Sequence, residues 1–141
     1  MKSLRELLHP YLKSIHLRVY FQDAPDNAQF PYLVYDFTQI TNDGEGFETA
    51  AVDIDGWDMP ADGDTTALET LMQTVNDALN KKTLLADEKL YGFYSPSQPF
   101  IVVEAPFAVT FYLDRKIPIR DDNPDIKRRK YIYEARLFGR G

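Results

Sequence analysis

The chain has 141 residues, 44% hydrophobic and 13% aromatic, which predicts one folded domain over residues 1–141 and excludes a disordered chain. It contains no cysteine, which excludes disulfide frameworks, thiolate metal sites and cysteine nucleophiles. The net charge of -6 at pH 7 argues against nucleic-acid binding as the main role, and no apolar run reaches the ~20 residues of a membrane span, so we expect a soluble, cytoplasmically made protein.

The N-terminal segment predicts a helix, because apolar residues from Leu4 to Ile15 recur on one helical face. Ser3 and Glu6 have the spacing of a capping box at its start. Pro10 removes a helical hydrogen bond, so we expect a kink there or two short turns. Strands are predicted next at 17–21, 32–40 and 47–57, because these segments are rich in aromatic and β-branched residues. The segments between them, 22–31 and 41–46, are rich in turn-forming residues.

The second half predicts another helix and three more strands. Five apolar residues lie on one face of this helix, at Leu68, Leu71, Met72, Val75 and Leu79. The later strands are predicted at 89–95, at 100–115 with an interruption at Pro106, and at 128–138, with a charged loop at 116–126. Because hairpin-length links dominate, we predict an α+β fold: a mostly antiparallel sheet of about five to six strands with two helices packed on one face.

The stretch "DMPADGDTTALE", Asp58 to Glu69, is close in sequence to an EF-hand calcium loop. Its third position is Pro60, which has no side-chain ligand, and the residues before it predict a strand where an EF-hand has a helix. Thr66 followed by Glu69 has the spacing of a capping box, which assigns Glu69 to the start of the second helix. We therefore predict a turn and a helix cap, with no metal bound.

Other candidate chemistry is weak. His9 and His16 are the only histidines, and both lie in or beside the first helix, where a surface position is the simpler interpretation. Asp53 and Asp55 share one strand face and could serve acid–base chemistry, but solvent-facing acidic strands are commoner. No phosphate-binding glycine loop is present. We therefore predict no catalytic residues and no cofactor.

The charges are segregated along the chain. Residues 21–80 contain thirteen Asp and Glu and no Lys or Arg, whereas residues 1–20 and 81–141 have net charges of +3 and +4. The basic run "KRRK" at 127–130, with Arg136 and Arg140, could contact phosphate, but we favour a solvated or subunit-facing surface. Such segregation gives the chain acidic and basic surfaces that could complement each other between subunits.

The order of these segments resembles the small tail-terminator or tail-completion proteins of long-tailed bacteriophages, also described as minor tail or head–tail joining proteins. The residues that carry the resemblance span roughly 3–138. They are Val19-Tyr20, Pro25, Asn27, Pro31-Tyr32, Trp57-Asp58, the helix "TTALETLMQTVNDAL", Arg128, Arg129 and Arg136.

The resemblance implies a ring, commonly a hexamer, that caps the tail tube and meets the head connector. The implied partners are further copies of the chain, the tail-tube protein and the connector or stopper protein, in the tail or neck of a virion assembled in the host cytoplasm. The family implies no catalytic residues. The alternatives are a small-ligand or peptide-binding module using the helix–sheet cleft and, less favoured, a hydrolase using the acidic cluster.

We further hypothesise that the acidic half forms a subunit-facing surface and much of a channel wall that repels DNA, while the basic strand faces a neighbour's acidic surface. The candidate interface or channel residues are Asp43, Glu45, Glu48, Asp53, Asp55, Asp58, Lys127, Arg128, Arg129, Lys130 and Arg136.

Overall fold

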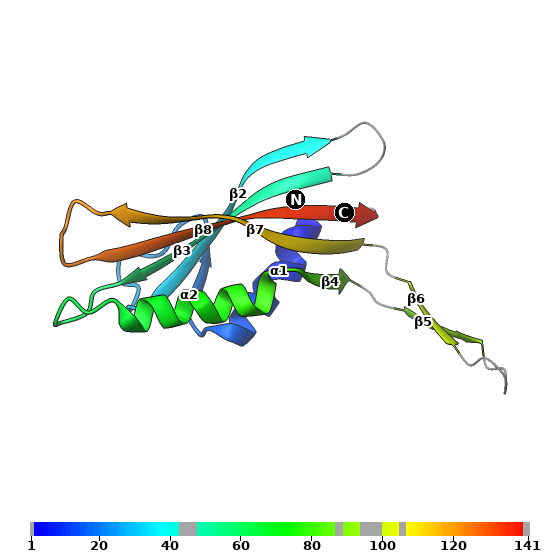
Figure 1. Ribbon diagram of the computed structural model, residues 1–141, viewed down its shortest axis with the longest axis horizontal. Helices are drawn as coiled ribbons and strands as arrows, with labels where there is room; N and C mark the ends of the chain where they lie inside the picture. The colour runs from blue at the N-terminus through cyan, green and yellow to red at the C-terminus, as the bar shows by residue number, and fades with distance from the viewer. Residues whose placement is uncertain (1, 43–47, 87–88, 94–99, 105–106, 140–141) are drawn as a thin grey trace.

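The computed structural model describes residues 2–42, 48–86, 89–93, 100–104 and 107–139 (Figure 1). Its elements in chain order are α1 (Lys2–Ile15), β1 (Val19–Phe21), β2 (Tyr32–Asn42), β3 (Glu48–Asp58), α2 (Thr66–Leu79), β4 (Lys82–Ala86), β5 (Lys89–Phe93), β6 (Phe100–Glu104), β7 (Phe107–Arg120) and β8 (Lys127–Gly139). None of the helices in these ranges is long and apolar enough to cross a membrane.

The main sheet has six strands in the order β1-β2-β3-β8-β7-β4. The α+β class is confirmed, but the expected mostly antiparallel sheet is corrected to a mixed one, because β1 runs parallel to β2 while the other neighbouring pairs run antiparallel. Because β1 is only three residues long, loop 22–31 has a short distance to cover in bringing the chain back, so that β2 starts alongside β1 in the same direction.

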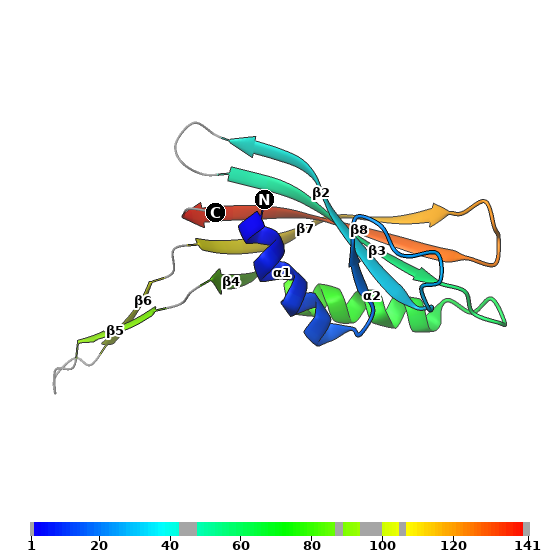
Figure 2. The same ribbon diagram turned by 180° about the vertical axis from the view of Figure 1, so that it is seen from behind.

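One buried core joins the sheet to the helices. Alternate residues of β3 and β8 are buried, as expected for strands with one face turned inward. Fully buried side chains from both helices belong to the same cluster, and the views in Figures 1 and 2 show both helices beneath the twisted sheet. The helical part of this cluster consists of Leu4, Leu8, Leu12, Leu68, Met72, Val75 and Leu79.

Several predicted boundaries change. α1 is one helix that contains Pro10, so the alternative of two short turns is wrong. β4 was not predicted, because "KTLLA" follows the second helix directly and has no period-2 pattern. β7 continues through Pro118 to Arg120, so half of the predicted loop 116–126 is strand. The predicted single strand 100–115 is wrong, since β6 and β7 are separate strands in different sheets; Pro106 itself lies outside the described residues.

β5 and β6 form a separate two-stranded antiparallel sheet. In Figures 1 and 2 this hairpin projects away from the main sheet beyond β4. The described part of the predicted strand 89–95 is β5, which belongs to this projection instead of the main sheet; residues 94 and 95 lie outside the described residues.

α2 lies close against β3 at Gly56. A Cβ atom placed on Gly56 would lie 2.5 Å from Met72 Sδ and 2.9 Å from Leu68 Cδ1, both closer than van der Waals contact. Because Gly56 has no side chain, Met72 and Leu68 of α2 can lie directly against β3 at this point.

We predict that Gly56→Ala destabilises the fold by about 1–3 kcal/mol, the usual range for an overpacked core. Urea unfolding measures the loss. In a Met72→Ala background the same substitution should have a much smaller effect, because the nearest atom in its way is gone. An equal loss in both backgrounds would show that this contact does not set the helix position.

Candidate assembly surfaces

The helix-free face of the sheet carries a charge seam, which we define as Asp53, Asp55 and Trp57 of β3 with Arg128 and Lys130 of β8. These residues alternate with the buried ones, so they share the face opposite the core. The antiparallel register places Asp55 opposite Lys130 and Trp57 opposite Arg128. The two halves of the segregated sequence therefore meet inside one chain.

The cations of the seam contact its carboxylates directly. Arg128 Nη2 lies 3.2 Å from Asp55 Oδ2, and Lys130 Nζ lies 3.6 Å from both Asp53 Oδ2 and Asp55 Oδ2. The Arg128 guanidinium also lies 3.8 Å from the centre of the Trp57 ring. The side chains of Arg128 and Asp55 are only 18% and 14% exposed, so water screens this pair less than an ordinary surface pair.

The seam is also partly desolvated. Three buried polar atoms, Asp55 Oδ1, Trp57 Nε1 and Arg128 Nε, have no hydrogen-bond partner in the described part of the chain. Burial raises the pKa of the Asp55 carboxyl above its ordinary value, while the charges of Lys130 and Arg128 act to lower it. Removing either ion of this pair would leave the other buried and uncompensated.

An aromatic row extends the seam toward β1. The rings of Trp57 and Tyr32 are stacked, with centroids 5.7 Å apart, and Tyr32 also contacts Phe30 and Tyr20. Arg18 donates hydrogen bonds to the carbonyl oxygens of Pro31 and Phe30 at 3.0 and 3.4 Å, and so holds the end of loop 22–31 beside this row.

The other acidic candidates lie apart from the seam. Asp58 is 7% exposed, on the core side of β3, and its Oδ1 accepts a hydrogen bond from the Met59 amide. Glu48 begins β3 and is half-buried. Asp43 and Glu45 lie outside the described residues. The acidic candidates that the structure describes, Glu48, Asp53, Asp55 and Asp58, thus do not form one continuous surface.

The other basic candidates also have partners within the chain. Arg129 Nε donates to Glu69 Oε1 of α2 at 2.6 Å, on the opposite side of β8 from the seam. Lys127 Nζ donates to the Pro124 carbonyl, and Arg136 pairs with Glu134 and lies over the Tyr112 ring. That these cations face a neighbouring subunit stays a prediction.

The calcium-like loop begins helix α2 differently from the prediction. The N-cap residue is Thr65, which makes no side-chain capping hydrogen bond. Asp64 Oδ1 accepts hydrogen bonds from the backbone N and the hydroxyl of Thr66, at 2.9 and 2.6 Å. The predicted capping box is wrong, because Glu69 is engaged by Arg129 and the aspartate before the helix takes over the capping role. Within the described ranges, no group of three or more His, Asp or Glu is arranged to hold a metal ion.

Both histidines contact residues of the fold. His9 Nδ1 lies 2.8 Å from the Tyr35 hydroxyl, and burial, with smaller effects of Lys13 and Arg5, lowers the pKa of His9. His16 Nε2 lies 2.9 Å from the Pro31 carbonyl oxygen.

A hollow that the sequence did not indicate lies at the turn between β7 and β8. Its volume is about 590 Å³. We call it the hairpin hollow; it is lined by Pro118, Ile119, Arg120, Asp121, Pro124, Ile126, Lys127 and Arg129, and by Gly63 and Thr65 ahead of α2. Its lining includes Pro118 and Ile119 of β7, which are apolar, and three cations, Arg120, Lys127 and Arg129. It comes from two segments that are far apart in sequence, 63–65 and 118–129, with no motif that links them.

Comparison with known proteins yields a structural match. The chain is similar in fold to a chain from the virion of a native gene transfer agent particle, with a TM-score of 0.59 and 16% sequence identity. The match covers 91% of this chain and 84% of the other. At that identity the likeness shows the fold alone. No family model and no curated protein matches the sequence.

We predict that Asp64→Ala lowers the melting temperature at pH 7 by more than Thr66→Ala, because it removes both hydrogen bonds at the start of α2. The hydrogen bonds from Thr66 lower the pKa of Asp64 below its ordinary value of 3.8. The stability that Asp64 supplies is therefore present above pH 3.8 and is lost as the pH falls through the lowered pKa.

The matched control is Asp64→Asn, which keeps an acceptor oxygen but does not titrate. Its difference from Asp64→Ala should not change between pH 7 and pH 3. If Thr66→Ala proves the more damaging of the two alanine substitutions, the hydroxyl is the true cap and this assignment is wrong.

Proposed function

We propose that this chain is a structural protein of a tailed, phage-like virion. The observation that carries the proposal is the fold match to a chain of the gene transfer agent virion, which spans nearly the whole of both chains. The family resemblance supports it independently, because that resemblance rests on the residues and their order and spacing, not on the fold match.

Within the virion, we place the chain in a ring that caps the tail tube and joins it to the head connector. A ring of identical subunits needs two different surfaces on each subunit. The sheet supplies two such sides, since it is open and its edges are formed by different strands, β1 with β2 on one side and β4 with β7 on the other. The tail-tube and connector proteins are the proposed partners, and the tail or neck is the proposed location.

The proposed role is structural and not catalytic. The side chains that the sequence offered for chemistry are engaged in the fold: His9 with Tyr35, His16 with a backbone carbonyl, and Asp53 and Asp55 with Lys130 and Arg128.

The charge seam also alters the proposed channel wall. Asp53 and Asp55 have cations in contact with them, so they add little net negative charge, and a DNA-repelling wall would depend on other carboxylates.

The test is deletion of the gene in the cell that encodes it, followed by purification of particles. We expect filled heads without joined tails, or tails of irregular length, and restoration of normal particles by the gene in trans. Quantitative mass spectrometry of normal particles should find the chain at about one hexamer per tail, as expected for a single closed ring.

Two results would contradict the proposal. Absence of the chain from purified particles would exclude a structural virion role. A copy number equal to that of the main tube subunit would support a virion protein but exclude the capping ring.

A further inference from the structure

One edge of the molecule carries an acidic loop that its own chain holds in place. Loop 22–31 includes exposed Asp23 and Asp26 on either side of Pro25, and neither aspartate makes an ion pair within the described residues. Backbone hydrogen bonds shape the loop, from Ala28 to the Pro25 carbonyl and from Asp23 to the Phe21 carbonyl. With Arg18 and His16 fixing its end, the loop presents its carboxylates from a defined position.

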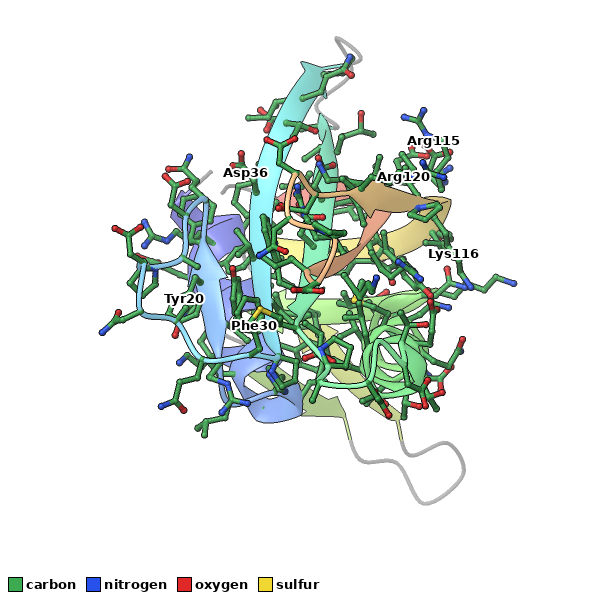
Figure 3. The ribbon with its side chains drawn as sticks, turned by 90° about the vertical axis from the view of Figure 1, so that its left-hand side faces the viewer. Tyr20, Phe30, Asp36, Arg115, Lys116 and Arg120 are labelled. Atoms are coloured by element: carbon green, nitrogen blue, oxygen red, sulfur yellow. The ribbon has the colours of Figure 1, made fainter. Side chains whose placement is uncertain are left out.

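The opposite edge is basic. β4 pairs only with residues 107–111 of β7, so in the described part of the chain the rest of β7 has no strand on that side. Arg115, Lys116 and Arg120 are exposed along this unpaired half. Figure 3 shows them on the side of the molecule away from Tyr20, Phe30 and Asp36. Of these three, Arg120 also lines the hairpin hollow, which adds Lys127.

The loop and the hollow lie at the same level of the sheet. The strand registers connect Tyr32 to Trp57, Trp57 to Arg128, and Arg128 to Ile119. Tyr32 follows loop 22–31 directly, and Ile119 lines the hollow. One row across four strands therefore ends in the acidic loop on one side and in the hollow on the other, which is the arrangement that a head-to-tail contact between copies needs.

The edges are poorly suited to joining by continuous strand pairing. Pro118 has no amide hydrogen to donate, and a register shift interrupts β7 between Leu113 and Arg115. On β2, the Phe37 amide is already bonded to Asp36 Oδ1. Prolines, bulges and charges of this kind block edge-to-edge pairing. A contact here must therefore be made by side chains and loops.

We propose that loop 22–31 of one copy docks in the hairpin hollow of the next copy. The carboxylates of Asp23 and Asp26 would approach Arg120 and Lys127, and Pro25 would lie against the apolar wall formed by Pro118 and Ile119. This contact rests on the proposed ring and identifies the surfaces that join its subunits. Complementary charges join the two edges, while the charges of the seam pair with each other within each subunit.

The charges that face the hollow favour this occupant. Arg129 is balanced by Glu69, and Asp121 accepts a hydrogen bond from the Asn123 amide while lining the hollow. Arg120 and Lys127 make no ion pair within the described residues. Two unpaired cations thus oppose one carboxylate, and an acidic loop with a proline at its centre complements both the charge and the apolar wall.

The experiment uses two reversed variants of the full chain. One carries Asp23→Lys and Asp26→Lys, and the other carries Arg120→Glu and Lys127→Glu. Sedimentation velocity over rising protein concentration measures self-association. Each variant alone should associate at least about tenfold more weakly than the wild type, because like charges meet at every junction. An equimolar mixture should recover association, since alternating variants make every junction complementary again.

A control variant, Lys13→Glu, reverses an exposed cation on α1, outside both proposed edges, and should associate like the wild type. Wild-type-like association of either reversed variant alone, or failure of the mixture to recover, would overturn the proposed contact. A wild type that stays monomeric at every concentration would also overturn it. None of these three results would bear on the virion role, which the particle analysis tests separately.

Discussion

The arrangement of this molecule depends on the register between β3 and β8, where the acidic first half of the chain meets the basic last strand. That register places the partly buried pair of Asp55 and Arg128 on the helix-free face and Gly56 against α2 on the other. A shift of one residue would turn Asp53 and Asp55 into the core and leave their cations unpaired. The charges therefore help to select one pairing out of the several that the hydrophobic pattern allows.

The same constraint determines what is left for assembly. Sequence segregation alone suggested that acidic and basic halves attract each other between subunits. In the fold, the central strands satisfy much of that attraction within the chain, and unpaired charge remains at the two edges. Surface charges of this kind contribute little energy individually. They can still orient subunits as they approach, which suits a ring that must close in one geometry.

The sequence predicted the elements with strong periodicity well, and it predicted contacts poorly. The apolar spacing of Leu68, Met72 and Val75 located α2, and alternation located β3 and β8. Glu69 does not cap α2, because it pairs with Arg129, sixty residues further along the chain, and Asp64 caps the helix instead. Capping rules use only neighbouring residues, so they could not predict this pair. The existence of β4 and the parallel pairing of β1 could not be predicted, because both depend on which strands become neighbours in the fold. The hairpin hollow joins two distant segments, so only the folded structure brings its lining together.

The central claim is that Asp55 and Arg128 attract each other within one chain. A double-mutant cycle with Asp55→Asn and Arg128→Gln, measured by urea unfolding at pH 7 and low protein concentration, tests it most directly. For this partly buried pair we predict a coupling of about 1 kcal/mol or more. The exposed pair of Asp114 and Arg115 should give much less. A coupling near zero, or one that arises only at concentrations where the chain associates, would contradict the account.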